Sequence, residues 1–366
     1  MILMNDFRRE PDALRSAMLA AVERVMNSGW YVLGEEGERF ERRWAGMCGV
    51  RHGVGVGNGM QAIEIALLAL NIGPGDEVIT TPMTAFATVL AILRTGATPV
   101  LADIDPQTAL LSLASADRCL SSRTRAVVLV HLYGQLAAMD AWTDWCAGRN
   151  LSLVEDCAHA HLATWRGRAA GCFGHVGAFS FYPTKNLGAL GDAGMLVTDD
   201  GALAKRACSL RNYGKSMLGR HAELGLNSRL DEMQAAILME RIGVLEHATA
   251  ARRAIAMTYR DAIRNPLVAL PSPPCENAAH VHHLFVINCE ARDALQAHLH
   301  RHGIQTLIHY PIPVHHQKPC RNLLRDPGGL LAAERHAHTC LSLPCHPYLD
   351  SAEVAAVVDA VNSFVP

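Results

Sequence analysis

The sequence predicts an α/β fold built on one large, mostly parallel sheet. Two observations lead to this class. Apolar runs typical of strands alternate with segments of helical periodicity through the first half of the chain. One run, residues 125–131, is almost unbroken Val and Leu, which is typical of a strand buried on both faces. Helices should therefore cover both faces, as in a doubly wound sheet.

The elements follow in order from apolar periodicity and turn residues. Seven strands are expected in the sheet, near residues 54, 78, 99, 128, 152, 179 and 196. Helices are expected over residues 15–26, 38–47, 60–70, 84–93, 139–147 and 202–210. Two long helical stretches, 231–245 and 248–263, precede a Pro-rich connector at 266–277. Further strands are expected at 283–288 and 341–344, and helices at 291–301 and 352–363.

Composition excludes several classes of function. The chain has 366 residues and a net charge of −2, which argues against the basic face that binds nucleic acid. It has no apolar run long enough to span a membrane, and its first residues do not resemble a signal peptide. The 11 cysteines are scattered without a Cys-x-x-Cys pair, which indicates reduced thiols in a cytoplasmic protein.

Histidines are numerous, and two clusters occur at 280–283 and 298–302. Neither cluster is accompanied by cysteines or carboxylates at the spacing of a zinc site. We therefore expect surface or substrate-side histidines and no metal.

The most informative stretch is residues 176–198. Two apolar strands, 176–182 and 194–198, flank a loop whose one basic residue is Lys185. A lone loop lysine is usually a solvated surface charge. Here the flanking strands are apolar enough to be interior, and the loop glycines permit another group to approach closely. A lysine with reduced hydration can act as an amine nucleophile toward a carbonyl.

Residues 180–192 (Ser-Phe-Tyr-Pro-Thr-Lys-Asn-Leu-Gly-Ala-Leu-Gly-Asp) closely resemble the lysine segment of the DegT/DnrJ/StrS family. These are nucleotide-sugar aminotransferases that use pyridoxal phosphate (PLP). The resemblance covers essentially the whole chain. It implies PLP-dependent transferase fold type I, with a large domain at 1–245 and a smaller α+β domain at 246–366. It also implies that Lys185 forms the Schiff base with PLP, and that Ser180 lies beside the cofactor.

A Gly-rich turn at residues 52–59 joins a strand to a helix and can seat a phosphate. Its spacing, Gly-x-Gly-x-Gly, departs from the dinucleotide pattern, and Ser209 replaces the first glycine that a P-loop ending at 214–216 would need. The family binds the PLP phosphate at this turn. It usually has a threonine after the glycine or alanine, whereas this chain has Gly59-Met60. A hydroxyl contact to the phosphate is therefore missing, and backbone N–H groups must supply more of the hydrogen bonds to it.

Asp156 ends a predicted strand, where ligands of parallel sheets bind. The residue could instead cap a helix. The family has Glu-Asp-x-Ala-Gln/His here, and residues 155–159 match it. The resemblance assigns Asp156 to the pyridine nitrogen of PLP, which it would keep protonated, and His159 to the ring.

Residues 227–230 resemble the family's Asn-x-Arg-Leu segment. There the asparagine reaches the cofactor phosphate of the neighbouring subunit, so Asn227 implies a homodimer with shared active sites. Alternatively, Asn227 and Ser228 cap the helix that starts near Leu230, and both interpretations can hold at once. The resemblance places several other side chains near the substrate: Tyr31, Tyr182, Tyr213, Arg229, His309, Tyr310 and His315. For Tyr31, in a segment similar to the family's Tyr-Val-Leu-Gly, an ordinary packed turn is the alternative.

One departure concerns the family's Pro-x-Thr-aromatic segment, whose ring stacks on PLP. The matching position here is Ala85, and the aromatic is one place later, at Phe86. One residue is a rotation of about 100° on a helix. We therefore expect Phe86 to pack into the core and Ala85 to leave the cofactor more open, with His159 as a compensating ring.

The function implied is amino transfer by a ping-pong mechanism. Glutamate would donate its amino group, Lys185 would shuttle the proton, and the acceptor would be a dTDP-linked 3-keto-6-deoxy sugar. Alternatives are a C4 keto sugar, a cyclitol ketone, or a PLP-binding regulator without catalysis. Sugar dehydratases of this fold carry histidine at the position of Lys185, which argues against them.

Overall fold

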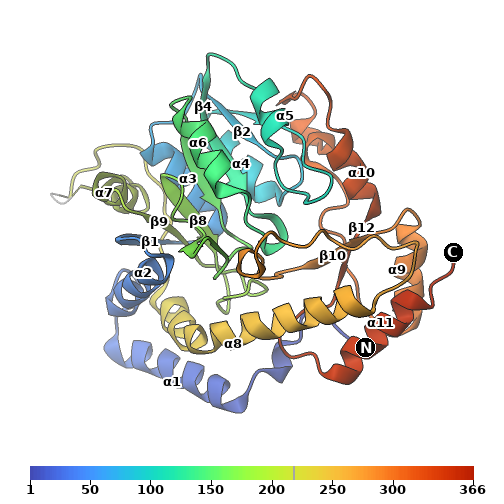
Figure 1. The fold of residues 1–366 in the computed structure, drawn as a ribbon. Helices are drawn as coiled ribbons and strands as arrows, with labels where there is room; N and C mark the ends of the chain where they lie inside the picture. Colours follow the sequence, from blue (N-terminus) through green and yellow to red (C-terminus); the bar gives the residue numbers. More distant parts are fainter. Residues whose placement is uncertain (217–218) are drawn as a thin grey trace.

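A computed structural model describes residues 1–216 and 219–366. Its centre is a sheet with helices around it (Figure 1). The sheet has eight strands in the order β1-β9-β8-β5-β4-β2-β3-β11. The strands are β1 (His52–Val56), β2 (Glu77–Thr80), β3 (Thr98–Leu101), β4 (Thr124–Val130), β5 (Ser152–Asp156), β8 (Val176–Ser180), β9 (Gly194–Thr198) and β11 (Leu324–Arg325). β9 runs antiparallel to both of its neighbours, and the other pairs are parallel.

All seven predicted strands lie in this sheet. β11 is the eighth, and it pairs with β3 at the edge. Its two residues are both exposed, so no apolar run marked it in the sequence. Four other helices and strands were also not predicted: α5 (Leu113–Arg118), α10 (Leu331–Thr339), and β6 (Thr164–Trp165) with β7 (Arg168–Ala169), which form a hairpin.

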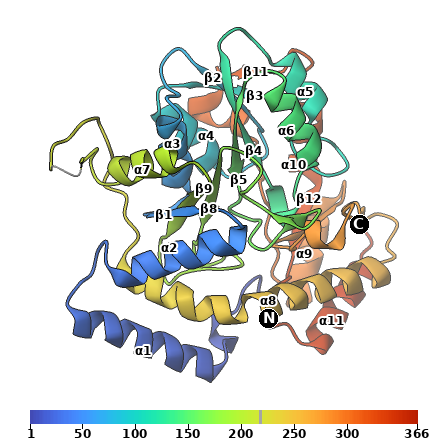
Figure 2. The same cartoon turned by 60° about the vertical axis from the view of Figure 1, so that its left-hand side comes forward.

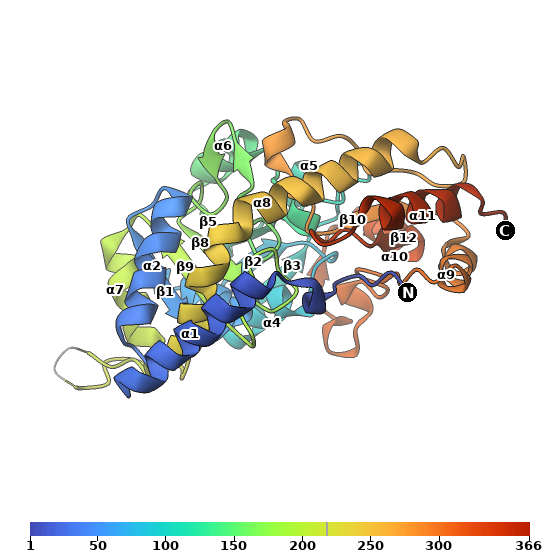
Figure 3. The same cartoon turned by 90° about the horizontal axis from the view of Figure 1, so that it is seen from below.

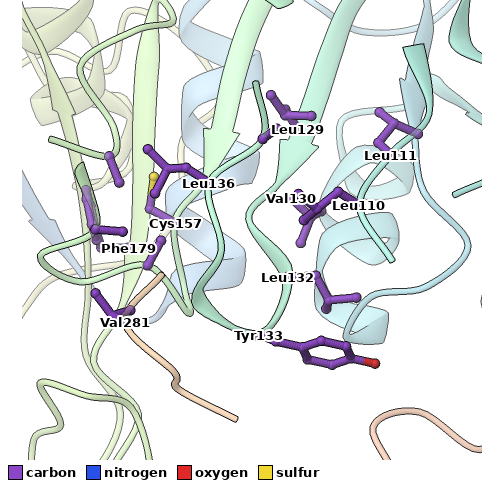
Figure 4. Close-up of a cluster of buried hydrophobic side chains, with 14 of the residues drawn as sticks. Leu110, Leu111, Leu129, Val130, Leu132, Tyr133, Leu136, Cys157, Phe179 and Val281 are labelled. Carbon is purple, nitrogen blue, oxygen red and sulfur yellow. The ribbon is translucent and has the colours of Figure 1, made fainter. Parts of the chain in front are cut away.

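Helices cover both faces of the sheet, as a doubly wound fold requires. Because side chains alternate along a strand, Ala126 and Val128 of β4 enter one core, while Val127 and Leu129 enter the other. The first core is closed by α3 (Gly59–Ala69), α4 (Phe86–Arg94) and α7 (Gly201–Leu210). The second is closed by α2 (Glu35–Cys48), α5, α6 (Met139–Ala147) and α8 (Glu232–Ala262) (Figure 2). Figure 4 shows part of the second core, where Leu129, Leu136 and Phe179 gather.

The helix α8 is continuous over 31 residues, so the prediction of two separate stretches was wrong. Residues 246 and 247 are Glu and His, and neither breaks a helix as Pro or Gly would. α8 runs from α1 (Asp12–Ser28) and α2 to the C-terminal elements (Figure 3). The predicted domain boundary at 245 falls inside this helix and stays a prediction.

The C-terminal elements have a core of their own. β10 (Phe285–Asn288) pairs antiparallel with β12 (Cys340–Leu343), and α9 (Arg292–Arg301) and α11 (Ser351–Asn362) pack beside them. The N-terminus joins this unit through a bridge between Ile2 and Ile304. Short 3-10 helices lie at Phe7–Arg9, Leu132–Gly134, Asn277–Ala279, Val314–His316 and Lys318–Cys320. Across residues 1–216 and 219–366, no helix has both the length and the apolar character needed to cross a membrane.

Candidate active site

The loop that carries Lys185 is anchored in the sheet at both ends. Ala189 donates its backbone N–H to the Phe181 carbonyl at 2.7 Å, and Lys185 donates its own to Tyr182 at 2.8 Å. Gly188 must be glycine, because a Cβ there would lie 2.3 Å from the Pro183 carbonyl oxygen. The loop therefore holds one backbone shape and presents Lys185 in a fixed place.

Lys185 lines a pocket, here called the front pocket, at the carboxyl ends of the parallel strands. The empty space in it is about 460 Å³. Seven of the predicted cofactor residues line it: Gly59, Met60, Ala85, Asp156, His159, Ser180 and Lys185. Desolvation lowers the pKa of Lys185 to about 8, although the Asp156 carboxylate opposes this shift. An appreciable fraction of the amine is then neutral near neutral pH, as a nucleophile or base requires.

Asp156 ends β5, and its carboxylate accepts two hydrogen bonds from the protein. Thr88 donates its Oγ1–H to Oδ2 at 2.8 Å, and the Ala158 N–H donates to Oδ1 at 3.1 Å. Thr84 and Thr88 share a hydrogen bond of 2.8 Å, which fixes the Thr88 hydroxyl in turn. Turns rather than a helix follow β5, so the capping alternative for Asp156 was wrong.

His159 is held as a neutral ring. Its Nδ1 accepts the Tyr133 backbone N–H at 3.2 Å, so the neutral imidazole carries its proton on Nε2. Burial, and then the charge of Lys185, hold the pKa of His159 well below its usual value. A second ring, His283, lies against it with centroids 4.3 Å apart. His159 can therefore donate a hydrogen bond to a ligand in the front pocket.

The first turn of α3 forms one wall of the front pocket. The Asn58 side chain accepts the Gln61 N–H at 2.9 Å, which leaves the first N–H groups of the helix, at Gly59 and Met60, for a ligand. A Cβ on Gly59 would lie 2.6 Å from the Ser180 Cβ, so this position needs glycine. The helix start offers an anion both donors and a favourable dipole.

Ala85 and Phe86 lie as the sequence analysis expected. Ala85 precedes α4 and lines the front pocket. Phe86 points elsewhere and packs, half-buried, against a small cluster that includes Val89 and Val314. Phe86 therefore cannot stack on a ligand in the front pocket without a shift of the helix start.

The residues predicted to meet the substrate do not line the front pocket. With Phe86, Tyr310 lines a neighbouring hollow that shares Thr84 with the front pocket. Burial raises the pKa of Tyr310. His309 accepts or donates a hydrogen bond at 2.8 Å to Ser342, and burial followed by the Lys185 charge lowers its pKa to about 4.

Three predicted substrate residues are surface aromatics. The exposed fractions of Tyr31, Tyr182 and Tyr213 are 49%, 51% and 43%. Asn227 is also exposed, and it bridges to Asn212 rather than reaching the front pocket. A single chain therefore does not bring these side chains to the site, and their roles stay predictions.

The remaining two predicted substrate residues have partners within the chain. Arg229 donates to the Asn212 side chain at 3.0 Å and lies over the Tyr213 ring at 5.2 Å. His315 is buried, and its Nε2 lies 3.0 Å from a carboxylate oxygen of Glu334. Its Nδ1 is buried and makes no hydrogen bond to another described residue.

Sequence reasoning missed residues that lie far from the lysine segment in the chain. Thr88 and Thr84 could have been noticed, because hydroxyls four residues apart at a helix start face the same way. The structure also brings together two groups of possible metal ligands: His131 with Glu155 and Cys157, and His315 with His316 and Glu334. Neither group was foreseen from ligand spacing.

At the carboxyl edge of the sheet, the front pocket combines a lysine of lowered pKa, a buried carboxylate and a helix N-terminus with free backbone N–H groups. The lysine can bind an aldehyde, the carboxylate a protonated pyridine, and the helix start a phosphate. This arrangement and the fold define a PLP-dependent transferase of fold type I.

The chain belongs to the DegT/DnrJ/EryC1/StrS aminotransferase family, whose model matches residues 12–362. It is 43% identical over 360 residues to dTDP-3-amino-3,4,6-trideoxy-alpha-D-glucose transaminase of Streptomyces venezuelae, covering 98% of this chain and 95% of that one. It is 42% identical over 364 residues to dTDP-3-amino-3,6-dideoxy-alpha-D-galactopyranose transaminase of Aneurinibacillus thermoaerophilus, covering 100% and 99%. The crystal structure of S. venezuelae DesV with a ketimine intermediate superposes with a TM-score of 0.95 at 42% identity, covering 100% and 99%. The chain is thus an aminotransferase, as the sequence predicted.

Proposed function

We propose that this enzyme uses PLP to move an amino group from glutamate to the C3 ketone of a dTDP-linked deoxysugar. The observation that carries the proposal is the front pocket, where Lys185 and Asp156 line one space beside the start of α3. The choice of sugar rests on the names of the two relatives, both of which are transaminases of dTDP-3-amino sugars.

The residues of the front pocket fit PLP. Gly59 and Met60 would bind the phosphate through their N–H groups, which the first turn of α3 leaves without a helical partner. Asp156 would bind the protonated ring nitrogen, and the Thr88 hydroxyl would orient its carboxylate. His159, with its proton on Nε2, would donate to an acceptor on the ring.

PLP, when bound, supplies an electron sink for the charge left on a substrate carbon that loses a proton. Lys185 would move that proton through Nζ, as base and then as acid. Its pKa of about 8 suits both directions, because neither protonation state is rare near neutral pH. The half-buried position of Lys185 limits the water that could compete for the proton.

A shared active site belongs to the same proposal. Asn227 is exposed and does not line the front pocket of its own chain. In a homodimer, Asn227 of the partner subunit would reach the phosphate seat, and the exposed Tyr31, Tyr182 and Tyr213 would meet the partner or the substrate. The purified protein should scatter light as a dimer or larger, and an active monomer would exclude the shared site.

The decisive experiment is a panel of nucleotide-linked keto sugars incubated with the enzyme, PLP and 15N-labelled glutamate. Mass spectrometry should show label in an aminated dTDP sugar, and NMR should place it at C3. Labelling at C4, or of a cyclitol ketone instead, would correct the substrate while keeping the class. No labelled product from any ketone would count against catalysis.

A further inference from the structure

Three possible metal ligands meet where the segment after Tyr310 lies against α10. His315 and His316 belong to the short 3-10 helix Val314–His316, and Glu334 lies in the first turn of α10. The ligand atoms of the three side chains all lie within 4.8 Å of one another. Two imidazoles and a carboxylate are a ligand set that suits Zn²⁺ and related transition metals.

The distances within this group fit a common ion. Nε2 of His315 lies 3.0 Å and Nε2 of His316 lies 3.5 Å from the same atom, Oε1 of Glu334. Ligand atoms that are about 2.0–2.1 Å from a tetrahedral zinc ion lie about 3.3–3.4 Å from one another. The two measured separations fall on either side of that value, so small side-chain shifts bring both nitrogens and the oxygen to bonding distance of one ion.

The three side chains differ in exposure in a way that suits a site at the surface. The exposed fraction is 1% for the side chain of His315, 51% for His316 and 36% for Glu334. The 3-10 helix is fixed, because the Val314 N–H donates to the Pro82 carbonyl at 3.0 Å. His315 therefore supplies a ligand in a set position, while an ion from solvent can reach His316 and Glu334 and keep a bound water.

The alternative is a hydrogen-bonded cluster without a metal, in which Oε1 of Glu334 accepts an N–H from each imidazole. The buried Nδ1 of His315 makes no hydrogen bond to another described residue. It is an unsatisfied acceptor if Nε2 carries the proton, and an unsatisfied donor if Nε2 binds an ion. Nδ1 therefore does not distinguish the two cases, whereas a direct measurement of metal binding does.

The other group of possible ligands, His131, Glu155 and Cys157, does not offer a comparable site. All three residues are buried. The oxygens of Glu155 already accept three backbone N–H groups and contact His131. Among the described residues, the histidines at 280–283 and 298–302 form no such group of ligands.

We propose that His315, His316 and Glu334 bind a divalent transition metal ion of the Zn²⁺ class. The ion joins the segment that follows Tyr310 to α10, beside the hollow that adjoins the front pocket. It gives His315 a role other than the predicted contact with the substrate. The site does not depend on amino transfer, so it can be tested without turnover.

The test is a spectroscopic titration of the untagged, PLP-loaded protein with Co²⁺, which replaces Zn²⁺ and has visible ligand-field bands. The expected result is one Co²⁺ per chain, without the near-ultraviolet charge-transfer band of a thiolate ligand. Absence of that band excludes the exposed thiols of Cys208 and Cys275 as the site. Excess Zn²⁺ should displace the Co²⁺, because it takes the same imidazole and carboxylate ligands.

Two variants remove the ligands nearest the surface. His316→Asn and Glu334→Gln should each weaken Co²⁺ binding by at least roughly 10–100-fold, the loss seen when a group that only hydrogen-bonds a metal ligand is removed. The control is His302→Asn. His302 is exposed and its ring lies against His298, with centroids 4.3 Å apart, but this pair belongs to no group of ligands among the described residues. The control should bind Co²⁺ as the wild type does.

Both ligand variants change partly exposed side chains, so their metal-free melting temperatures should match that of the wild type. If one variant unfolds, the other decides. The inference would be overturned by the absence of Co²⁺ bands, by a thiolate band as the only signal, by wild-type affinity in both ligand variants, or by an equal loss in His302→Asn.

Discussion

Two neighbouring carboxylates on β5, Glu155 and Asp156, differ in how many protein groups donate hydrogen bonds to them. Glu155 and Asp156 are consecutive, so their side chains leave the sheet on opposite faces. Both are buried, with exposed fractions of 0% and 6%. They differ in how completely the protein satisfies their oxygens.

Glu155 has its hydrogen-bonding capacity filled by the chain. It accepts backbone N–H groups from Gly171 at 3.0 Å and from Phe173 and Gly174 at 2.8 Å each, and it lies 3.1 Å from His131 Nε2. Burial alone would raise the pKa of Glu155, but the His131 contact and the backbone donors lower it on balance. Such a carboxylate stabilises the fold, because each of its oxygens already has two hydrogen-bonding contacts within the chain.

Asp156 has two protein donors, Thr88 and the Ala158 N–H, and it faces the front pocket. The unused acceptor capacity is available to a cation in that pocket. Under the proposed function, burial does not distinguish the functional carboxylate from the structural one, whereas the unused acceptor capacity of Asp156 does.

The largest effect should come from removing the amine that shares the front pocket with Asp156. Lys185→Ala should lower turnover by roughly 10⁴-fold or more, because among the described residues Lys185 is the one amine that lines the front pocket. The variant should still fold, and it should lose PLP during dialysis. Stopped-flow and steady-state rates measure the first effect, and cofactor absorbance measures the second. Undiminished turnover would remove Lys185 from the mechanism.

Asp156→Asn should come next. The amide keeps the shape and the Thr88 contact but removes the charge, so turnover should fall by roughly 10²-fold, the scale of one key electrostatic partner. The melting temperature should change little, because only two protein donors are affected. Kinetics equal to those of the wild type would show that Asp156 serves structure only.

Glu155→Gln is the matched change on the other face, and it should produce the reverse pattern. The amide NH₂ would meet backbone donors, so the free energy of unfolding should fall by about 3 kcal/mol. Turnover per folded molecule should equal that of the wild type. Urea unfolding with activity measured on the native fraction checks both. A loss of turnover like that of Asp156→Asn would erase the distinction between the two carboxylates.

The buried Glu155 should also make the free energy of unfolding depend on pH. Because the folded-state pKa of Glu155 lies below its ordinary value of 4.5, its stabilising contribution is full above that value. The contribution is lost as pH falls through the folded-state pKa. The wild type should therefore lose more stability in acid than Glu155→Gln does, and parallel unfolding curves from pH 6 to pH 3 would contradict this account.

Local signals made part of this structure predictable. The seven apolar runs predicted the seven strands, and the Gly-rich turn, the strand-end aspartate and the lysine loop each carry their pattern within a few residues. Contacts between distant residues were not predictable. The Thr88 hydroxyl meets Asp156 across 68 positions of sequence.

The substrate side shows a different limit. Asn227, Tyr31 and Tyr213 carry a family pattern, yet in one chain they lie on the surface. If a second subunit completes the site, no property of the single fold would reveal it.

The continuity of α8 is a simpler case, because the absence of Pro and Gly at residues 246 and 247 already favoured one helix.

The smallest predicted effect concerns the wall of the front pocket at Ala85. Ala85 lines the pocket with a methyl group, whereas Phe86 packs against Val89 and Val314. A missing aromatic stack is worth roughly 0.5–1.5 kcal/mol, a few-fold to about tenfold in affinity. Ala85→Phe should therefore slow the loss of PLP during dialysis by that factor. Phe86→Ala should leave PLP retention unchanged and lower the melting temperature, because it removes apolar contacts at a distance from the pocket. If Phe86→Ala released PLP from a stable protein, Phe86 would be the stacking ring in solution, and α4 would have to begin one residue later than it does here.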